Sequence, residues 1–122
     1  MGFNETLAGI ANRIDGCAAV LILGIDGIPI DRCVRDIDPA IDIDAIAAEF
    51  TTLVKRGMRT AASTELGEMR EMMLASDLMT CLLRPITPEY FLLLALNPGG
   101  NLGRARFELR KAQLSVETEF TM

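Results

Sequence analysis

Two groups of residues in this sequence have types and spacings that could do chemistry. The first is a glycine-rich turn at residues 97–103, which is followed by Arg104 and Arg106. Glycine-rich loops can cradle phosphate groups, but this turn lacks the G-x-x-x-x-G-K-[ST] spacing and no lysine follows it. We therefore interpret its glycines as residues that let a helix dock closely on a sheet: Gly99, Gly100 and Gly103.

The second group consists of aspartates in two D-x-D pairs, Asp36 with Asp38 and Asp42 with Asp44. Carboxylates at such spacing bind calcium in EF-hand loops, but the glycine and the terminal glutamate of that loop are missing here. We expect a solvated loop and the cap of a helix at this place, and no metal site.

The sequence has few residues that could form other kinds of catalytic site. The sequence has no histidine, so a Ser-His-Asp or Cys-His site cannot be built and the usual zinc sites lose their nitrogen donor. The three cysteines, Cys17, Cys33 and Cys81, lack CxxC spacing and lie in apolar surroundings. We expect them in the core of a protein from a reducing compartment. The prediction is a protein that is not an enzyme, with no catalytic residue and no cofactor.

Composition limits the remaining classes of function. The net charge of −5 disfavours nucleic-acid binding, which needs a basic surface. The length of 122 residues fits one domain over residues 1–122. The longest apolar run, residues 91–96, is far shorter than the roughly 20 residues that span a bilayer. The first residues do not resemble a signal peptide, so we expect a cytoplasmic protein without membrane insertion.

Helical spacing of apolar residues predicts three helices, over residues 3–14, from Asp42 or Asp44 to about 64, and over about 102–118. Gly16 suits a left-handed cap after the first helix, and Asn101 can cap the last one. On the last helix we expect a buried face of Leu102, Ala105, Leu109, Ala112 and Val116. Its charged face would carry Arg104, Arg106, Glu108, Arg110 and Lys111.

Apolar runs predict five strands, over residues 17–24, 28–34, 67–74, 78–84 and 89–96. Asp26-Gly27 is a hairpin signal, Pro29 indicates an edge strand, and Pro85 to Pro88 would form a later turn. The order α-β-β-α-β-β-β-α predicts an α+β fold in which one antiparallel sheet carries helices on both faces.

Two segments in this order resemble the Roadblock/dynein light chain family: residues 20–30 (VLILGIDGIPI) and residues 97–106 (NPGGNLGRAR). The resemblance spans about residues 3–116. It implies a profilin-like sandwich that dimerises, with strand 67–74 at a sheet edge pairing with its copy and the long second helices side by side. Such pairing would protect an apolar edge that otherwise invites aggregation. The implied dimer interface comprises Met69, Glu71, Met72, Met73 and Leu74.

The resemblance also implies a function, a homodimeric regulator that binds a Ras-like small GTPase through its second helices and modulates the nucleotide cycle. The corresponding helix face comprises Ala45, Ala48, Glu49, Thr52, Lys55, Arg56 and Arg59. Family members of this kind supply no catalytic residue, which argues against Arg56 or Arg59 as an arginine finger.

Three alternatives stay open at this point. The second helix could present an ordinary solvated face. The protein could be a structural adaptor of a motor or signalling complex with no effect on nucleotide turnover, or a small-molecule sensor. The partner, the direction of any effect and a heterodimer with another Roadblock protein are not decided by the sequence.

Overall fold

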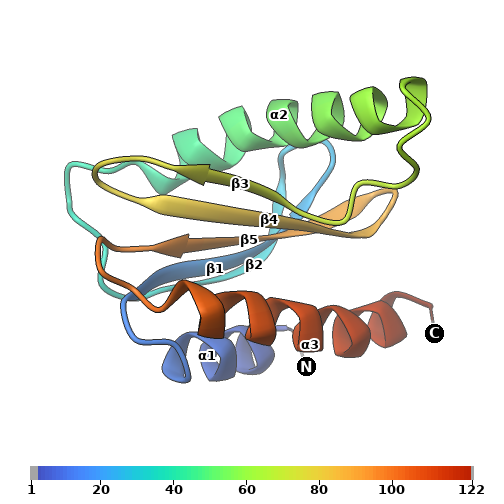
Figure 1. The fold of residues 1–122 in the computed structure, drawn as a ribbon. Helices are drawn as coiled ribbons and strands as arrows, with labels where there is room; N and C mark the ends of the chain where they lie inside the picture. The colour runs from blue at the N-terminus through green and yellow to red at the C-terminus, as the bar shows by residue number, and fades with distance from the viewer. Residues whose placement is uncertain (1–2, 122) are drawn as a thin grey trace.

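The computed structural model describes the backbone of residues 3–121 and the side chains of residues 3–116. Within that range the helices and strands follow one another in the predicted order (Figure 1). They are α1 (Asn4–Asn12), β1 (Cys17–Gly24), β2 (Pro29–Val34), α2 (Ile43–Ser63), β3 (Met72–Ala75), β4 (Thr80–Thr87), β5 (Tyr90–Leu96) and α3 (Leu102–Thr121).

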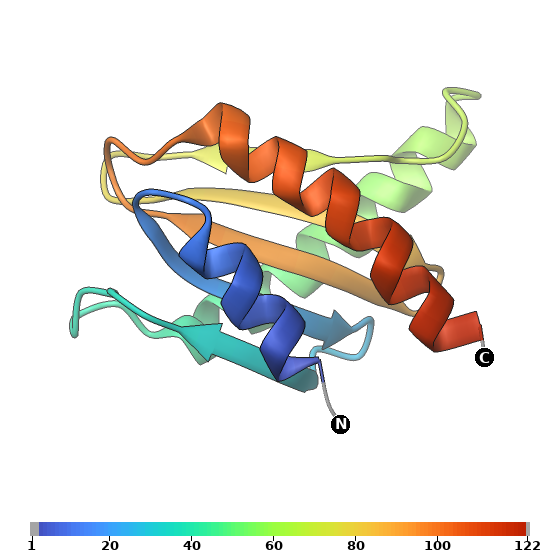
Figure 2. The same cartoon turned by 90° about the horizontal axis from the view of Figure 1, so that it is seen from below.

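The strands form one five-stranded antiparallel sheet in the order β2-β1-β5-β4-β3. Helix α2 covers one face of the sheet, and α1 and α3 lie side by side on the other (Figures 1 and 2). The predicted α+β layout with helices on both faces is confirmed. Strands β2 and β3 are the two edges, and each is paired on one side only.

The core lies on both sides of the two central strands. All of β1 is buried, and so are the six residues from Phe91 to Leu96 of β5. Alternate residues face opposite layers: Val20 and Ile22 pack under α1 and α3, whereas Leu21 and Leu23 pack under α2. A sheet covered on both faces requires such continuous apolar strands.

Helix boundaries follow local capping. Asp42 is the N-cap of α2, and its carboxylate accepts hydrogen bonds from the backbone N–H groups of Asp44 and Ala45. Asn101 caps α3 by accepting from the N–H of Arg104 at 3.0 Å. Helix α1 ends at Asn12, two residues before the predicted end. None of the helices in residues 3–121 is both long and apolar enough to cross a membrane.

The third strand is shorter than predicted. The prediction was residues 67–74, but β3 begins only at Met72. The chain must first cross from the layer of α2 to the edge of the sheet, and Glu65 and Gly67 with positive φ of 60° and 90° turn it there. Met69 packs against α2, where its sulfur lies close to Gly57. Residues 67–71 therefore belong to a connection rather than to the strand.

Pro85 was predicted to begin a turn, but it lies inside β4, and the turn follows at Pro88 and Glu89. The register explains why the strand accepts a proline. Backbone groups of alternate β4 residues face β3, and Leu83 is the last that has a β3 partner. Pro85 faces the same side beyond the start of β3, so no ladder bond needs its missing N–H.

Two glycines join the turn after α1 to the turn after β5. Gly16 has a φ of +82°, as its predicted capping position requires, and it packs directly on Gly100. The turns are also tied by hydrogen bonds from the N–H of Asn97 to Gly16 O and from the N–H of Asn101 to Asp15 O. The predicted docking role holds for Gly100. It is wrong for Gly99, which has open space around it, and for Gly103, which is exposed and close only to Asn101.

We expect Gly16→Ala to destabilise the fold by about 3 kcal/mol, because a Cβ there would lie 2.6 Å from the Cα of Gly100 in a left-handed conformation. The matched control is Gly99→Ala, which has a φ of +83° but open space around the added carbon. It should cost only about 1 kcal/mol. Urea unfolding of both variants measures the difference, and equal losses would contradict the close packing.

Candidate functional site

The outer face of α2 carries the seven residues predicted to bind a partner. All seven are exposed: Ala45, Ala48, Glu49, Thr52, Lys55, Arg56 and Arg59. None of them forms an ion pair with a described residue. The face therefore presents charges that no described part of the chain neutralises.

Leu53 also belongs to this face. Its side chain is 38% exposed. It lies four residues after Glu49 and three before Arg56, so the three share one side of the helix. An apolar residue between charged ones is a usual composition for a contact surface. The helical position of Leu53 relative to Glu49 was the signal available in the sequence.

The residues predicted for the dimer interface divide into three groups. Met73 and Leu74 lie in β3, and each is 42% exposed. Met72 is half-buried and packs toward α2, as does Met69 in the preceding connection. Glu71 directly precedes β3, and its side chain turns toward α3. Only two of the five side chains are thus exposed in the edge strand itself, and the sulfur of Met73 lies 4.0 Å from Arg106 Nη2.

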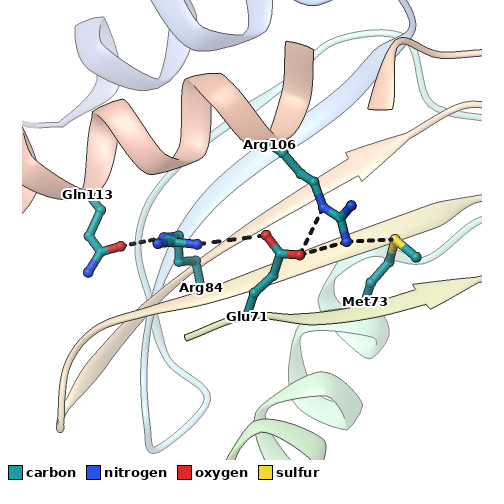
Figure 3. Close-up of polar contacts among 5 residues, drawn as sticks. All are labelled: Glu71, Met73, Arg84, Arg106 and Gln113. Carbon is teal, nitrogen blue, oxygen red and sulfur yellow. Dashed lines mark hydrogen bonds and ion pairs between the residues drawn. The ribbon is translucent and has the colours of Figure 1, made fainter. Parts of the chain in front are cut away.

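Glu71 ties the start of β3 to α3 (Figure 3). Its Oε2 accepts a hydrogen bond from Arg106 Nε at 2.9 Å and is 2.8 Å from Arg106 Nη2. Its Oε1 lies 3.7 Å from Arg84 Nη1, and Arg84 also donates to Gln113 of α3. Burial lowers the pKa of Arg84, and the Glu71 carboxylate opposes that effect. The network fixes the place where the chain enters the sheet edge.

The two edges of the sheet differ in their free backbone groups. In β2, Arg32 points its N–H and carbonyl away from β1, because its neighbours Asp31 and Cys33 make the ladder bonds. Both outward groups are occupied: the N–H donates to the Asp31 carboxylate at 2.9 Å, and the carbonyl accepts from Asn4 Nδ2 at 3.0 Å. At Arg32, in the middle of the strand, edge β2 is therefore blocked by the protein's own side chains.

Edge β3 has no such protection. Ser76 N–H donates to Met79 O, and the alternation from this bond directs the N–H and carbonyl of Met73 and Ala75 away from β4. Among the described residues, none bonds to these outward groups of Met73 and Ala75. This edge is available for a further strand.

The residues considered for phosphate or calcium chemistry have structural partners. Arg104 and Arg106 pair with carboxylates of Glu108 and Glu71. Asp38 accepts from the N–H of Ala40, and Asp44 pairs with Arg32 at 2.8 Å. Among the described side chains of residues 3–116, no group of three or more acidic or cysteine residues is placed to hold a metal ion.

The cysteines are placed largely as expected. Cys17 and Cys81 are buried, and burial raises the pKa of each thiol to about 11. They are protonated and unreactive at neutral pH. Cys33 is half-buried at the β2 edge.

Glu108 is a buried charge that the sequence placed on the exposed face of α3. Its side chain is fully buried, and its oxygens lie 2.8 Å from Arg13 Nε, 2.8 Å from Arg104 Nη2 and 3.7 Å from Lys111 Nζ. Burial acts to raise its pKa, but the hydrogen bond and charge of Arg13, with Lys111 and Arg104, hold the pKa below its usual value. The carboxylate joins α1 to α3.

A cleft of about 710 Å³ lies between the 65–70 connection and the turn after β4. Its lining mixes apolar and charged side chains, among them Met58, Met69, Ile86, Arg70 and Arg84. It adjoins the Glu71 network and the β3 edge.

Comparison with known proteins gives matches among solved structures, whereas no protein-family model and no curated protein matches. MglC from Myxococcus xanthus is 32% identical over 98% of this chain and 99% of that one, with a TM-score of 0.69. The Roadblock/LC7 domain from Streptomyces avermitilis has a TM-score of 0.86 at 16% identity, with both chains fully covered. Myxococcus xanthus MglB has a TM-score of 0.84 at 14% identity over 98% and 94% of the two chains.

We expect Glu108→Gln to lower stability by about 2 kcal/mol near neutral pH, because three cations lose their charged partner. The folded pKa of Glu108 lies below its unfolded value of 4.5, so the ionised carboxylate stabilises the native state above that pH. This stabilisation disappears as the pH falls through the lowered folded pKa.

Urea unfolding at several pH values measures this difference. The gap between wild type and Glu108→Gln should therefore narrow in acid. Glu89→Gln, at an exposed carboxylate without an ion pair to any described residue, is the control and should leave stability unchanged. A gap that stays constant down to about pH 3 would show that the charge of Glu108 is not responsible.

Proposed function

This chain belongs to the Roadblock/LC7 family, and from that membership we propose a non-catalytic homodimer that binds a Ras-like small GTPase and modulates its nucleotide cycle. The relatives MglC and MglB support a role in a regulatory system of this kind. One observation carries the proposal: the same protomer has an open sheet edge at β3 and, on α2, an exposed face whose charges have no partner among the described residues.

The dimer would form through β3. At this edge the outward N–H and carbonyl groups of Met73 and Ala75 have no partner among the described residues, whereas in β2 Asn4 and Asp31 occupy those of Arg32. The exposed Met73 and Leu74 supply apolar contacts beside the strand pair. A solved MglB structure has a tetrameric arrangement, which supports self-association in the family.

Pairing of two protomers through β3 would also form the surface that binds the GTPase. An antiparallel strand pair between two copies has a two-fold axis that continues the sheet from one protomer into the next. With the axis perpendicular to the sheet, both copies of α2 stand on the same side. The two outer faces then form one surface that displays Leu53, Arg56 and Arg59 twice.

The proposed mechanism is a shift in the conformations of the GTPase. The paired α2 surface binds the switch regions in one arrangement more tightly than in others, and that difference in affinity moves the population toward it. No residue of this chain enters the phosphoryl-transfer step. We assign the protein to the cytoplasm, where its unpaired cysteines stay reduced.

The dimer predicts a clear effect of Met73→Pro, which removes an outward N–H without breaking the ladder to β4. Two symmetric hydrogen bonds are lost, at about 1 kcal/mol each, so dimer affinity should fall on the order of thirtyfold. Light scattering across a dilution series measures the change, and circular dichroism checks that the variant folds.

Val34→Pro is the matched control, because the N–H of Val34 also points outward, but from the β2 edge. It should leave the dimer intact. A wild-type chain that is monomeric at micromolar concentration, or a dimer that Val34→Pro disrupts and Met73→Pro does not, would overturn the assignment of the interface.

GTPase binding is tested by a pulldown from lysate of the source cells, loaded with GDP or with a non-hydrolysable GTP analogue. We expect a small GTPase to be retained with the analogue and not with GDP. Arg56→Glu should reduce that retention at least tenfold, because it reverses an unneutralised charge at the centre of the α2 face.

Arg110→Glu reverses another exposed helix arginine, on the opposite side of the sheet, so it should leave retention unchanged. Recovery of other proteins regardless of nucleotide would contradict the proposal and indicate a structural adaptor instead.

A further inference from the structure

We propose that the outer face of α3 is a second docking surface, whose occupant is an acidic amphipathic helix of another protein. The surface, here called the α3 stripe, comprises Arg104, Phe107, Lys111 and Leu114. It goes beyond the proposed function, because it lies on the side of the sheet opposite α2 (Figures 1 and 2).

The stripe combines exposed apolar groups with cations at helical spacing. Phe107 is 52% exposed and Leu114 is 68% exposed. The Arg104 guanidinium lies 5.4 Å from the centre of the Phe107 ring, and Lys111 Nζ lies 5.5 Å from it. Steps of three and four residues along α3 place the four side chains on one side of the helix. Two cations thus lie close to the aromatic ring.

Buried Glu108 holds these cations in place. Arg104 and Lys111 both pair with it, and so does Arg13 from α1. One carboxylate therefore faces three cations, and it is itself inaccessible to a partner. The cations remain 43%, 43% and 53% exposed for Arg13, Arg104 and Lys111. Because their positions are already restricted, a partner loses less side-chain entropy in binding them.

Charge complementarity identifies the occupant. The stripe is locally positive in a chain of net charge −5, so carboxylates are the groups it attracts. An anionic lipid surface would attract the same cations, but it would also meet the repulsion of the whole acidic molecule. A protein segment that reaches only α3 avoids most of that repulsion, which favours it as the occupant.

The geometry of α3 defines the segment further. Phe107 and Leu114 are separated by two helical turns, about 10 Å along the axis. A partner helix packed along α3 needs apolar residues at the same spacing, with glutamates or aspartates beside them to meet Arg104 and Lys111. A protein bound here leaves α2 free, so this chain could join such a partner to whatever α2 binds.

The test uses the full-length protein and synthetic helical peptides. The probe carries two leucines spaced as Phe107 and Leu114 are, flanked by glutamates, and the comparison peptide has lysines in place of the glutamates. We expect the acidic peptide to bind, as measured by fluorescence anisotropy, and the lysine peptide not to bind. Affinity should fall with added salt, because exposed charges are screened.

Two variants locate the binding. Lys111→Glu and Phe107→Ala should each weaken binding of the acidic peptide at least tenfold, and both alter exposed side chains. Lys55→Glu on α2 and Leu66→Ala, at a residue 78% exposed in the connection after α2, are the matched controls and should have no effect.

Absence of binding, or binding that the controls weaken as much as the α3 variants do, would overturn the proposal. Flotation with phosphatidylserine vesicles tests whether an anionic membrane, rather than an acidic helix, binds the α3 stripe. Binding to those vesicles that Lys111→Glu abolishes, without binding of the acidic peptide, would assign the stripe to a membrane surface and refute a protein occupant. None of these outcomes depends on GTPase binding through α2.

Discussion

Burial of β1 and β5 on both faces is the constraint on which the other features of this structure depend. Every residue of β1 is enclosed, and each fully buried leucine or isoleucine contributes about 2 kcal/mol. Such strands require a helical layer on each side, which α2 supplies on one face and α1 with α3 on the other. Since the apolar faces of the helices are turned inward, the surfaces left for partners are the sheet edges and the outer sides of α2 and α3.

The two edge strands of the sheet, β2 and β3, differ in whether side chains of the protein bond to their outward backbone groups. At β2, side chains of Asn4 and Asp31 occupy the outward backbone groups of Arg32. At β3, the Glu71 network with Arg84 and Arg106 fixes the start of the strand but leaves its outer side open. Because an open antiparallel edge is prone to uncontrolled association, the block at Arg32 of β2 favours pairing through β3.

The outer helix faces differ in how their charges are held. On α2, Arg56 and Arg59 have no carboxylate partner among the described residues. On α3, Glu108 is enclosed by three cations, and breaking such a buried group of charges is costly. Glu108 therefore fastens α1 to α3 and also determines how positive charge is presented outside them. The charged side chains of α2 are thus not held by an ion pair to any described residue, whereas Glu108 holds those of Arg104 and Lys111 on α3.

The sequence alone determined the order of the elements, because the periods of helices and strands are local properties. For the same reason it located the left-handed Gly16 and narrowed the start of the second helix to Asp42 or Asp44, of which the structure has Asp42 as the cap. It did not determine the start of β3, the strand position of Pro85 or the burial of Glu108. Each of these depends on where a distant segment lies: α2 beside Met69, the beginning of β3 opposite Leu83, and Arg13 of α1 beside α3. Only the tertiary structure brings such segments together, because contacts between residues far apart in the chain leave no periodic signal in the sequence.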